Sequence, residues 1–219
     1  KRMLEISSLQ GSIKDEQFKE NLYKAQTNDV LWHGIFGGLY LPNLRDNAYR
    51  YLIKCDNIRY KNDNIFIEHK DINCDGLDEI RIITKKQSYI VSSIGGQIIE
   101  FDDKEKLFNF QNVITRRKEA YHTKMLHAAL SSNENDEVSS IHSSNFEADK
   151  TIEDVFYFDW YNKNSFIDHI SDKSFNLKSF HDCSFIEYGD FVNMPYEFNI
   201  NRHSVFFERY GGIYMEKKF

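Results

Sequence analysis

The spacing of apolar residues changes near Tyr60, and this change restricts the chain to a small set of folds. Before Tyr60 the apolar residues recur every three or four positions, which is typical of an α-helix with one buried face. These residues are Phe18, Leu22 and Ala25, followed by Leu44, Ala48, Leu52 and Cys55. Ser12 and Asp15 resemble a capping box in which the Ser12 hydroxyl covers a backbone N–H, and Pro42 suits the first turn of a second helix. The first quarter of the chain is therefore predicted to be a helical hairpin.

Short β-branched runs replace the helical pattern after this point. They occupy residues 65–67, 80–83 and 89–91, with turn residues at 75–76 and 95–96 between them. Runs spaced by about ten residues are typical of antiparallel strands in a sandwich or barrel. The sequence thus predicts an α+β protein, in which a helical hairpin precedes a large antiparallel β-sandwich.

The domain boundary is expected where the period changes. Residues 1–58 are assigned to the helical segment, and residues 59–219 to the β-sandwich domain. Within that domain, polar residues dominate positions 131–150, which predicts a surface loop that is partly disordered. Strand-like, aromatic-rich sequence resumes at residues 155–161 and again at 205–210.

Charge and composition exclude several classes of function. The 28 Lys and Arg residues stand against 34 Asp and Glu residues, so the net charge of -6 gives no basic surface for nucleic acid or an anionic membrane. No apolar run approaches the roughly 20 residues that a membrane helix needs. Three widely spaced cysteines without a C-x-x-C pair indicate reduced thiols and a cytoplasmic protein. The absence of an initiator Met indicates either a processed start or a piece of a longer protein.

The first candidate site is the Gly-rich segment of residues 28–38. Asp29, Trp32 and His33 place a carboxylate, an indole and an imidazole within five positions. An indole face packs on the C–H face of a pyranose ring, while neighbouring polar groups bind its hydroxyls. The alternative is a hairpin corner in which Trp32 fills the core and His33 is merely hydrogen-bonded.

The second candidate is a calcium loop at residues 71–79. Its oxygen donors would be the side chains of Asp71, Asn73, Asp75 and Glu79 and the carbonyl of Leu77. Calcium prefers six to eight hard oxygen ligands, and Gly76 lets the chain wrap around an ion. Ile82 stands where an EF-hand has its closing Glu. The alternative is a hairpin turn that binds nothing.

The third feature is the charged segment of residues 115–122. Adjacent Arg116 and Arg117 beside Glu119 and His122 would suit an anion or a sugar, but a salt-bridged loop is the favoured interpretation. Zincin, P-loop, G-x-G-x-x-G and G-x-S-x-G signatures are absent from the sequence. We therefore assign no catalytic residue to this chain.

Residues 22–42 resemble the helical region of glycoside hydrolase family 57. They read L-Y-K-A-Q-T-N-D-V-L-W-H-G-I-F-G-G-L-Y-L-P, which is similar to the pattern A-Q-x-N-D-x-x-W-H-G-x-F-G-G-x-Y-L-P of 4-α-glucanotransferases and related α-amylases. Residues 71–79, 114–122, 159–161 and 168–169 resemble the C-terminal β domain of that family.

The resemblance implies a site and a mechanism. In the family, a preceding seven-stranded β/α barrel supplies a glutamate nucleophile and an aspartate acid/base for a retaining reaction, which needs two carboxylates about 5 Å apart. Neither the barrel nor its two catalytic carboxylates are expected in this chain. Asp29 and Trp32 match the acidic and aromatic members of the last motif of the site, and His33 adjoins them. The C-terminal domain is implied to be a galactose-mutarotase-like supersandwich.

The expected function is therefore that of the helical and β-sandwich portion of an α-1,4-glucan-processing enzyme, 4-α-glucanotransferase or α-amylase in type. Its expected partners are an α-1,4-glucan or maltooligosaccharide and the absent catalytic barrel. By itself the chain is predicted to be inactive. The alternative is a non-catalytic carbohydrate-binding or structural β-sandwich module.

Overall fold

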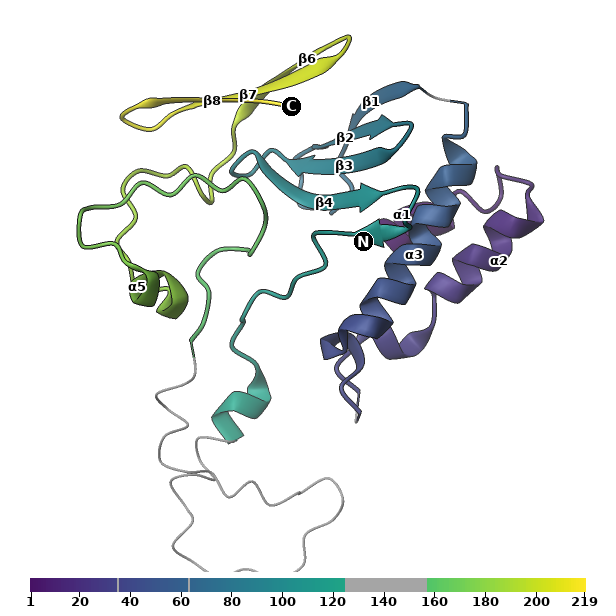
Figure 1. The fold of residues 1–219 in the computed structure, drawn as a ribbon, viewed down its shortest axis with the longest axis horizontal. Coiled ribbons are helices and arrows are strands. Elements are labelled where there is room, and N and C mark those ends of the chain that lie inside the picture. The colour runs from purple at the N-terminus through teal and green to yellow at the C-terminus, as the bar shows by residue number, and fades with distance from the viewer. Residues whose placement is uncertain (35, 63, 125–156) are drawn as a thin grey trace, which may run out of the picture. The chain divides into compact units, whose positions relative to one another are not determined.

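The computed structural model of the chain describes residues 1–34, 36–62, 64–124 and 157–219 (Figure 1). These residues form two units. The first comprises Lys1–Ile114, Lys163–Ile170 and Glu187–Phe219, and the second lies within Thr115–Asn162 and Ser171–Ile186. The predicted loop at 131–150 lies outside the described residues, and the domain boundary expected at residues 58/59 stays a prediction.

Three helices open the first unit. They are α1 (Arg2–Ser8), α2 (Glu16–Ala25) and α3 (Pro42–Arg59), and the 3-10 turns η1 (Asn28–Leu31) and η2 (Gly38–Tyr40) lie between the last two. The cap predicted at Ser12 is wrong. Asp15 caps α2 by accepting from the Phe18 N–H at 3.0 Å, because the Ser12 hydroxyl donates to the Leu9 carbonyl instead. Pro42 starts α3 as predicted.

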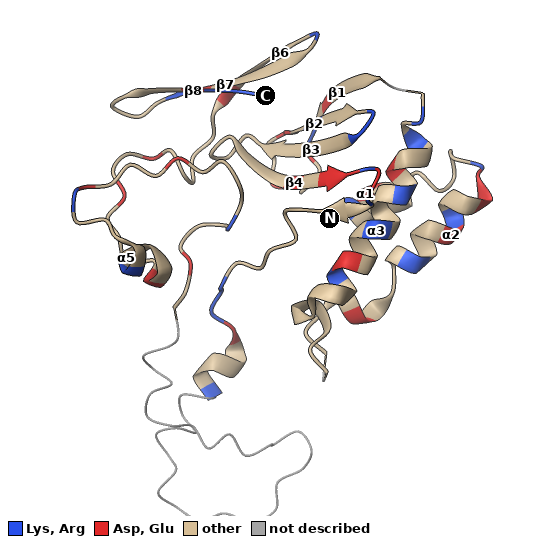
Figure 2. Ribbon diagram, viewed as in Figure 1, with Lys and Arg blue, Asp and Glu red and all other residues tan. Residues whose placement is uncertain are grey.

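The three helices share one apolar core. The buried stripe of α2 packs against α3, and Ile6 of α1 completes the cluster. Its fully buried members are Ile6, Phe18, Leu22, Ala25, Leu52 and Cys55. Charged residues of both signs are interspersed along α2 and α3 (Figure 2). Both α2 and α3 therefore bury one face and expose a polar one, as the helical spacing predicts.

Two antiparallel sheets follow the helices in the same unit. The larger is a meander in the order β1 (Ile65–Lys70), β2 (Glu79–Thr84), β3 (Gln87–Ser92), β4 (Gln97–Asp103) and β5 (Phe108–Asn109). The smaller contains β6 (Glu197–Asn201), β7 (Ser204–Tyr210) and β8 (Tyr214–Lys218). Strands are confirmed for the runs at residues 65–67, 80–83, 89–91 and 205–210.

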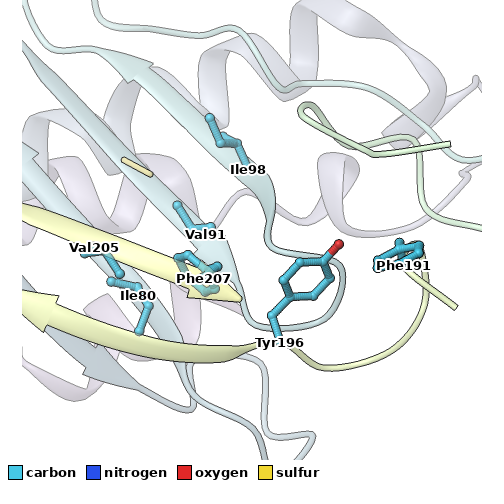
Figure 3. Packing of buried hydrophobic residues seen from close by; sticks show 7 residues of the cluster. All are labelled: Ile80, Val91, Ile98, Phe191, Tyr196, Val205 and Phe207. Atoms are coloured by element: carbon cyan, nitrogen blue, oxygen red, sulfur yellow. The ribbon is translucent and has the colours of Figure 1, made fainter. Parts of the chain in front are cut away.

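An apolar core joins the two sheets. Val205 and Phe207 of β7 face strands of the larger sheet, whose Ile80 pairs with Val91 (Figure 3). Side chains alternate along a strand, so Ile80 points into this core while Arg81 points to the opposite face of the sheet. There Arg81 donates to Glu5 of α1. The larger sheet is thus covered by helices on one face and by the smaller sheet on the other, which confirms the predicted α+β class.

The described residues of the second unit include the short helix α5 (Leu177–Asp182), a helical turn at residues 120–124 and an aromatic cluster around Phe185. The strand predicted at 155–161 is wrong for its described residues, 157–161, which are not in a strand. The Asp159 N–H there donates to the Arg116 carbonyl, and the Arg116 N–H donates to the Asp159 carboxylate, each at 2.8 Å. Residues 155–156 of that prediction lie outside the described part of the chain.

Candidate functional site

The segment between α2 and α3 folds back on itself. After η1 the chain turns at Trp32, and the Leu39 N–H donates to the Trp32 carbonyl at 2.8 Å. Gly38 has a φ of +48°, and a Cβ there would lie 2.1 Å from the Trp32 oxygen. Only glycine fits this position without moving the backbone, because L side chains rarely adopt that φ and the carbonyl already fills the space. The glycines of the motif therefore hold a closed loop.

This loop presents the three predicted side chains to solvent. Asp29 on η1 and His33 are exposed, and Trp32 is 45% exposed. The His33 ring meets the Trp32 ring edge-on, with centroids 5.4 Å apart. Trp32 is absent from the apolar cluster that α2 and α3 build, so the indole does not fill that core.

Exposed apolar residues lie on either side of Trp32 in the sequence. Leu31 precedes it, and Phe36, at 90% exposed, lies on the turn that follows. A carboxylate and an imidazole beside an apolar surface can bind a ligand that has both hydroxyls and C–H faces. The roles of Asp29, Trp32 and His33 in binding sugar stay predictions.

The second candidate loop, residues 71–79, joins β1 to β2. The Asp71 carboxylate accepts from the backbone N–H groups of Asp75 and Gly76, at 3.2 and 3.0 Å. The Asn73 side-chain amide lies 2.7 Å from an Asp75 carboxylate oxygen and 2.5 Å from one of Glu79. Oxygen-bearing side chains from three of the predicted positions thus meet around Asn73.

Glu79 is a buried carboxylate that amide groups of Ile72 and Asn73 solvate. It accepts from the backbone N–H groups of Ile72 and Asn73 at 3.0 and 3.1 Å. Burial raises its pKa, and the charge of Asp75 raises it further, whereas the hydrogen bonds from Asn73 and Ile72 lower it. A cation at this point would relieve the cost of the buried charge.

The fit to calcium depends on more than carboxylates. Across residues 1–34, 36–62, 64–124 and 157–219, no three His, Cys, Asp or Glu side chains gather closely enough to hold a metal ion. The Asn73 amide, turned by half a rotation, and the Leu77 carbonyl would have to complete the set, as the donor list from the sequence requires. Calcium binding by Asp71, Asn73, Asp75, Leu77 and Glu79 stays a prediction.

The third feature, residues 115–122, is structural. Arg116 donates to the Asp159 carboxylate from Nε at 3.0 Å and from Nη2 at 2.6 Å, and the Asp159 side chain is fully buried. Arg117 donates to Asn162 at 2.6 Å. The salt-bridged loop favoured by the sequence is confirmed.

Two further observations concern the cysteines and the helices of the described residues. Cys55, Cys74 and Cys183 are free thiols. Among the helices of the described residues, none is both long enough and apolar enough to cross a bilayer.

Sequence reasoning missed the polar residues that hold the 28–38 loop. Arg45 of α3 donates to the Leu39 carbonyl at 2.5 Å and to the Asn112 side chain at 2.6 Å. No motif marks either residue, since they are separated by 67 positions and meet only in the folded chain.

Two family models match successive parts of the chain. The family model described as alpha-amylase/4-alpha-glucanotransferase, middle domain, matches residues 1–59. The model described as alpha-amylase/4-alpha-glucanotransferase, C-terminal, matches residues 71–219. The two matches follow each other along the chain in the order that their descriptions imply.

Individual proteins agree with the family models. Alpha-amylase 1 of Dictyoglomus thermophilum is 36% identical over 193 residues, which cover 87% of this chain and 27% of that protein. The 4-alpha-glucanotransferase of Thermococcus litoralis is 34% identical over 224 residues, covering 100% of this chain and 32% of that protein. The crystal structure of the Thermococcus litoralis 4-alpha-glucanotransferase superimposes with a TM-score of 0.76 at 28% identity, over 99% of this chain and 30% of that chain. The chain thus spans about a third of the length of these relatives.

Proposed function

The chain belongs to the alpha-amylase/4-alpha-glucanotransferase family, the glycoside hydrolase family 57 type that its sequence resembles, and from this premise we propose that it is the middle and C-terminal part of an α-1,4-glucan-processing enzyme. Its substrate is an α-1,4-glucan or a maltooligosaccharide. Its own contribution to the reaction is to bind glucose units through the loop of residues 28–38.

The observation that carries the proposal is the half-exposed indole of Trp32 in a closed loop. The ring is 45% exposed although two amphipathic helices flank it and bury their own apolar stripes. Glucose has C–H faces that stack on an indole and equatorial hydroxyls that hydrogen-bond to polar side chains. Asp29 and His33, both exposed on the same loop, are the polar groups placed to take those hydroxyls.

The bond-breaking chemistry is proposed to lie elsewhere in the enzyme. A retaining mechanism needs a carboxylate nucleophile and a carboxylic acid/base about 5 Å apart. We assign neither role to a residue of this chain and place both on a β/α barrel in the remaining two thirds of a protein of the relatives' length. The protein is proposed to be cytoplasmic, on the basis of its free cysteines.

A binding titration tests this function directly. The chain is titrated with maltoheptaose by calorimetry, alongside Trp32→Ala and, as a matched aromatic control in the second unit, Trp160→Phe. Wild type and Trp160→Phe are expected to bind, and Trp32→Ala to bind at least about fivefold more weakly, because one lost stacking contact is worth about 1 kcal/mol or more. Equal binding by all three proteins contradicts the role of the loop.

The alternative is a non-catalytic carbohydrate-binding or structural β-sandwich module. The sequence of the gene upstream of Lys1 separates the two. An in-frame β/α barrel with two carboxylates supports the enzyme, whereas a stop codon directly before Lys1 supports the module.

A further inference from the structure

A chain of hydrogen bonds leads from the end of the large sheet to the backbone of Trp32. Asn112, which follows β5, accepts from the Arg45 Nε at 2.6 Å. Arg45 donates from Nη1 to the Leu39 carbonyl at 2.5 Å. The Leu39 N–H in turn donates to the Trp32 carbonyl at 2.8 Å. Asn112 therefore lies three hydrogen bonds from the residue that carries the proposed sugar platform.

The chemistry of its partners determines how Asn112 is oriented. Its Oδ1 faces a guanidinium, which can only donate, and its Nδ2 donates to an Asp46 carboxylate oxygen at 2.5 Å, which can only accept. Both halves of the amide are used, and each partner is charged, so these hydrogen bonds belong to the stronger class. Arg45 and Asp46 are adjacent in the first part of α3, so Asn112 clamps this end of the helix.

The loop that Arg45 contacts has little conformational freedom. The Cβ-free Gly38 lies against the Trp32 carbonyl, and Leu39 follows it directly. A shift of Arg45 would move the Leu39 carbonyl, and only the Cα of Leu39 separates that carbonyl from the peptide whose N–H donates to Trp32. The position of the indole is therefore tied to the position of the guanidinium.

We propose that Asn112 is a positioning residue for the glucan-binding loop, holding Trp32 in its binding orientation through Arg45 and Leu39. The part of this inference that concerns sugar binding rests on the proposed function. The part that concerns the order of the loop does not. It gives the C-terminal domain a task in substrate binding, because Asn112 lies within residues 71–219, whereas Trp32 and Arg45 lie within residues 1–59.

The test measures the order of Trp32 in a Trp160→Phe background, where Trp32 is the only tryptophan left. Acrylamide quenching and fluorescence anisotropy report the mobility of the indole, and maltoheptaose titration reports binding. Asn112→Ala removes both side-chain contacts. Gln97→Ala is the control for general loss of stability, since Gln97 is buried in β4 and donates to the Val192 carbonyl at 2.6 Å.

The expected result is specific to Asn112. Asn112→Ala raises quenching, lowers anisotropy and weakens maltoheptaose binding about two- to tenfold, the range that corresponds to one lost hydrogen bond. Gln97→Ala lowers the melting temperature but leaves the Trp32 signal and binding as in the background protein. Should Asn112→Ala fail to fold, Asn112→Asp serves instead, because it keeps an acceptor for Arg45 and adds repulsion from Asp46.

A charge swap provides the rescue. In the double substitution Asp46→Asn with Asn112→Asp, the new amide at position 46 can donate to the new carboxylate at position 112, which also accepts from Arg45. Quenching and binding are therefore expected to return to the values of the background protein. Identical Trp32 signals in the Asn112 and Gln97 variants, or an altered signal with unchanged binding, overturn the inference. A background protein that does not bind maltoheptaose instead contradicts the proposed function, while the quenching data still show whether Asn112 orders the loop.

Discussion

The guanidinium of Arg81, in the middle of β2, donates to the carboxylate of Glu5 on α1 at 2.8 Å, and both side chains are buried. Arg59 of α3 donates to the same carboxylate at 3.0 Å. Arg81 also donates to Glu68 of β1 at 3.0 Å. Helices and sheet are thus joined by charges that neither could bury alone, since an unpaired buried charge costs several kcal/mol.

A second cluster joins the same layers. Arg2 of α1 lies 2.6 Å from Asp56 of α3 and contacts two carboxylates of β4, Glu100 at 2.5 Å and Asp102 at 2.7 Å. Burial raises the pKa of Glu100 against the lowering effect of Arg2. We therefore expect the helices and the large sheet to unfold together rather than as separate domains.

The first prediction concerns the pH dependence of stability. Burial by itself would raise the pKa of Glu5, but the hydrogen bonds and charges of Arg81 and Arg59 lower it from 4.5 to about 2. Because the folded pKa is lowered, the stabilisation is fully present above about pH 4.5 and is lost as the pH falls towards 2. The shift corresponds to about 3 kcal/mol.

Glu5→Gln should therefore be destabilised at pH 7 and approach wild type near pH 2. Urea unfolding at a series of pH values measures the difference between the two proteins. Glu20→Gln is the control, because the Glu20 carboxylate and its partner Lys24 are both exposed. A constant difference between wild type and Glu5→Gln from pH 7 to pH 2 would contradict the assignment of the charge to Glu5.

The second prediction concerns the turn at Gly38. Gly38→Ala should lower the melting temperature more than Gly212→Ala does. Both glycines have positive φ, which costs about 1 kcal/mol for alanine, but only at Gly38 would the new Cβ meet backbone, 2.1 Å from the Trp32 oxygen. Calorimetric melts of the two variants check this, and equal shifts would show that the Trp32 carbonyl can move freely.

The third prediction is kinetic and uses the complete enzyme. Trp32→Ala should reduce kcat/KM for an α-1,4-glucan by about five- to 150-fold, because one stacking aromatic supplies about 1–3 kcal/mol of transition-state binding. The melting temperature should stay unchanged, since the indole is 45% exposed. A collapsed melting temperature with a proportionate loss of activity would show that Trp32 is a core residue.

The fourth prediction is that the chain by itself neither cleaves nor transfers glucan. The two carboxylates of a retaining mechanism are assigned to the part of the enzyme outside these 219 residues. Incubation with amylose or maltotriose, followed by analysis of reducing ends and product lengths, checks this. Turnover above a heat-inactivated sample would overturn the division of roles.

The fifth prediction concerns calcium at residues 71–79. Calcium should raise the melting temperature and EDTA should lower it, because an ion that binds only the folded state stabilises it by about 2.7 kcal/mol at a hundredfold excess over Kd. Asp75→Ala should abolish this response, whereas Asp78→Ala, outside the predicted donor set, should retain it. A melt that is the same with calcium and with EDTA leaves the loop as a hairpin turn.

Local pattern was sufficient for the helices α2 and α3, for the strands β1, β2, β3 and β7, and for the candidate loop. Helical spacing around Leu22 and Leu52 predicted α2 and α3, because a helix with one buried face repeats its apolar residues whatever it packs against. The β-branched runs predicted β1 to β3 for the corresponding reason. The closely spaced Trp32, His33 and glycines predicted the loop, since side chains that can bind a ligand and residues that allow a sharp turn lie within a few positions.

Pattern failed where a partner distant in sequence decided the outcome. Residues 157–161 have the aromatic content of a strand, but Asp159 is held by Arg116, 43 positions away, and the segment pairs with no strand. The Ser12 hydroxyl was a reasonable cap until the turn before α2 brought the Leu9 carbonyl within 2.9 Å of it.

The residues that join the layers were beyond prediction for the same reason. Arg81 sits in a β-branched run and gives no sign that it will be buried against Glu5, 76 positions earlier. Asn112 likewise meets Arg45 only when α3 packs beside β5. The period of apolar residues reports which side of an element is buried, so the elements and their inner faces follow from the amino-acid order; the partner of a buried charge depends on which elements come together, and that is settled only when the whole chain has packed.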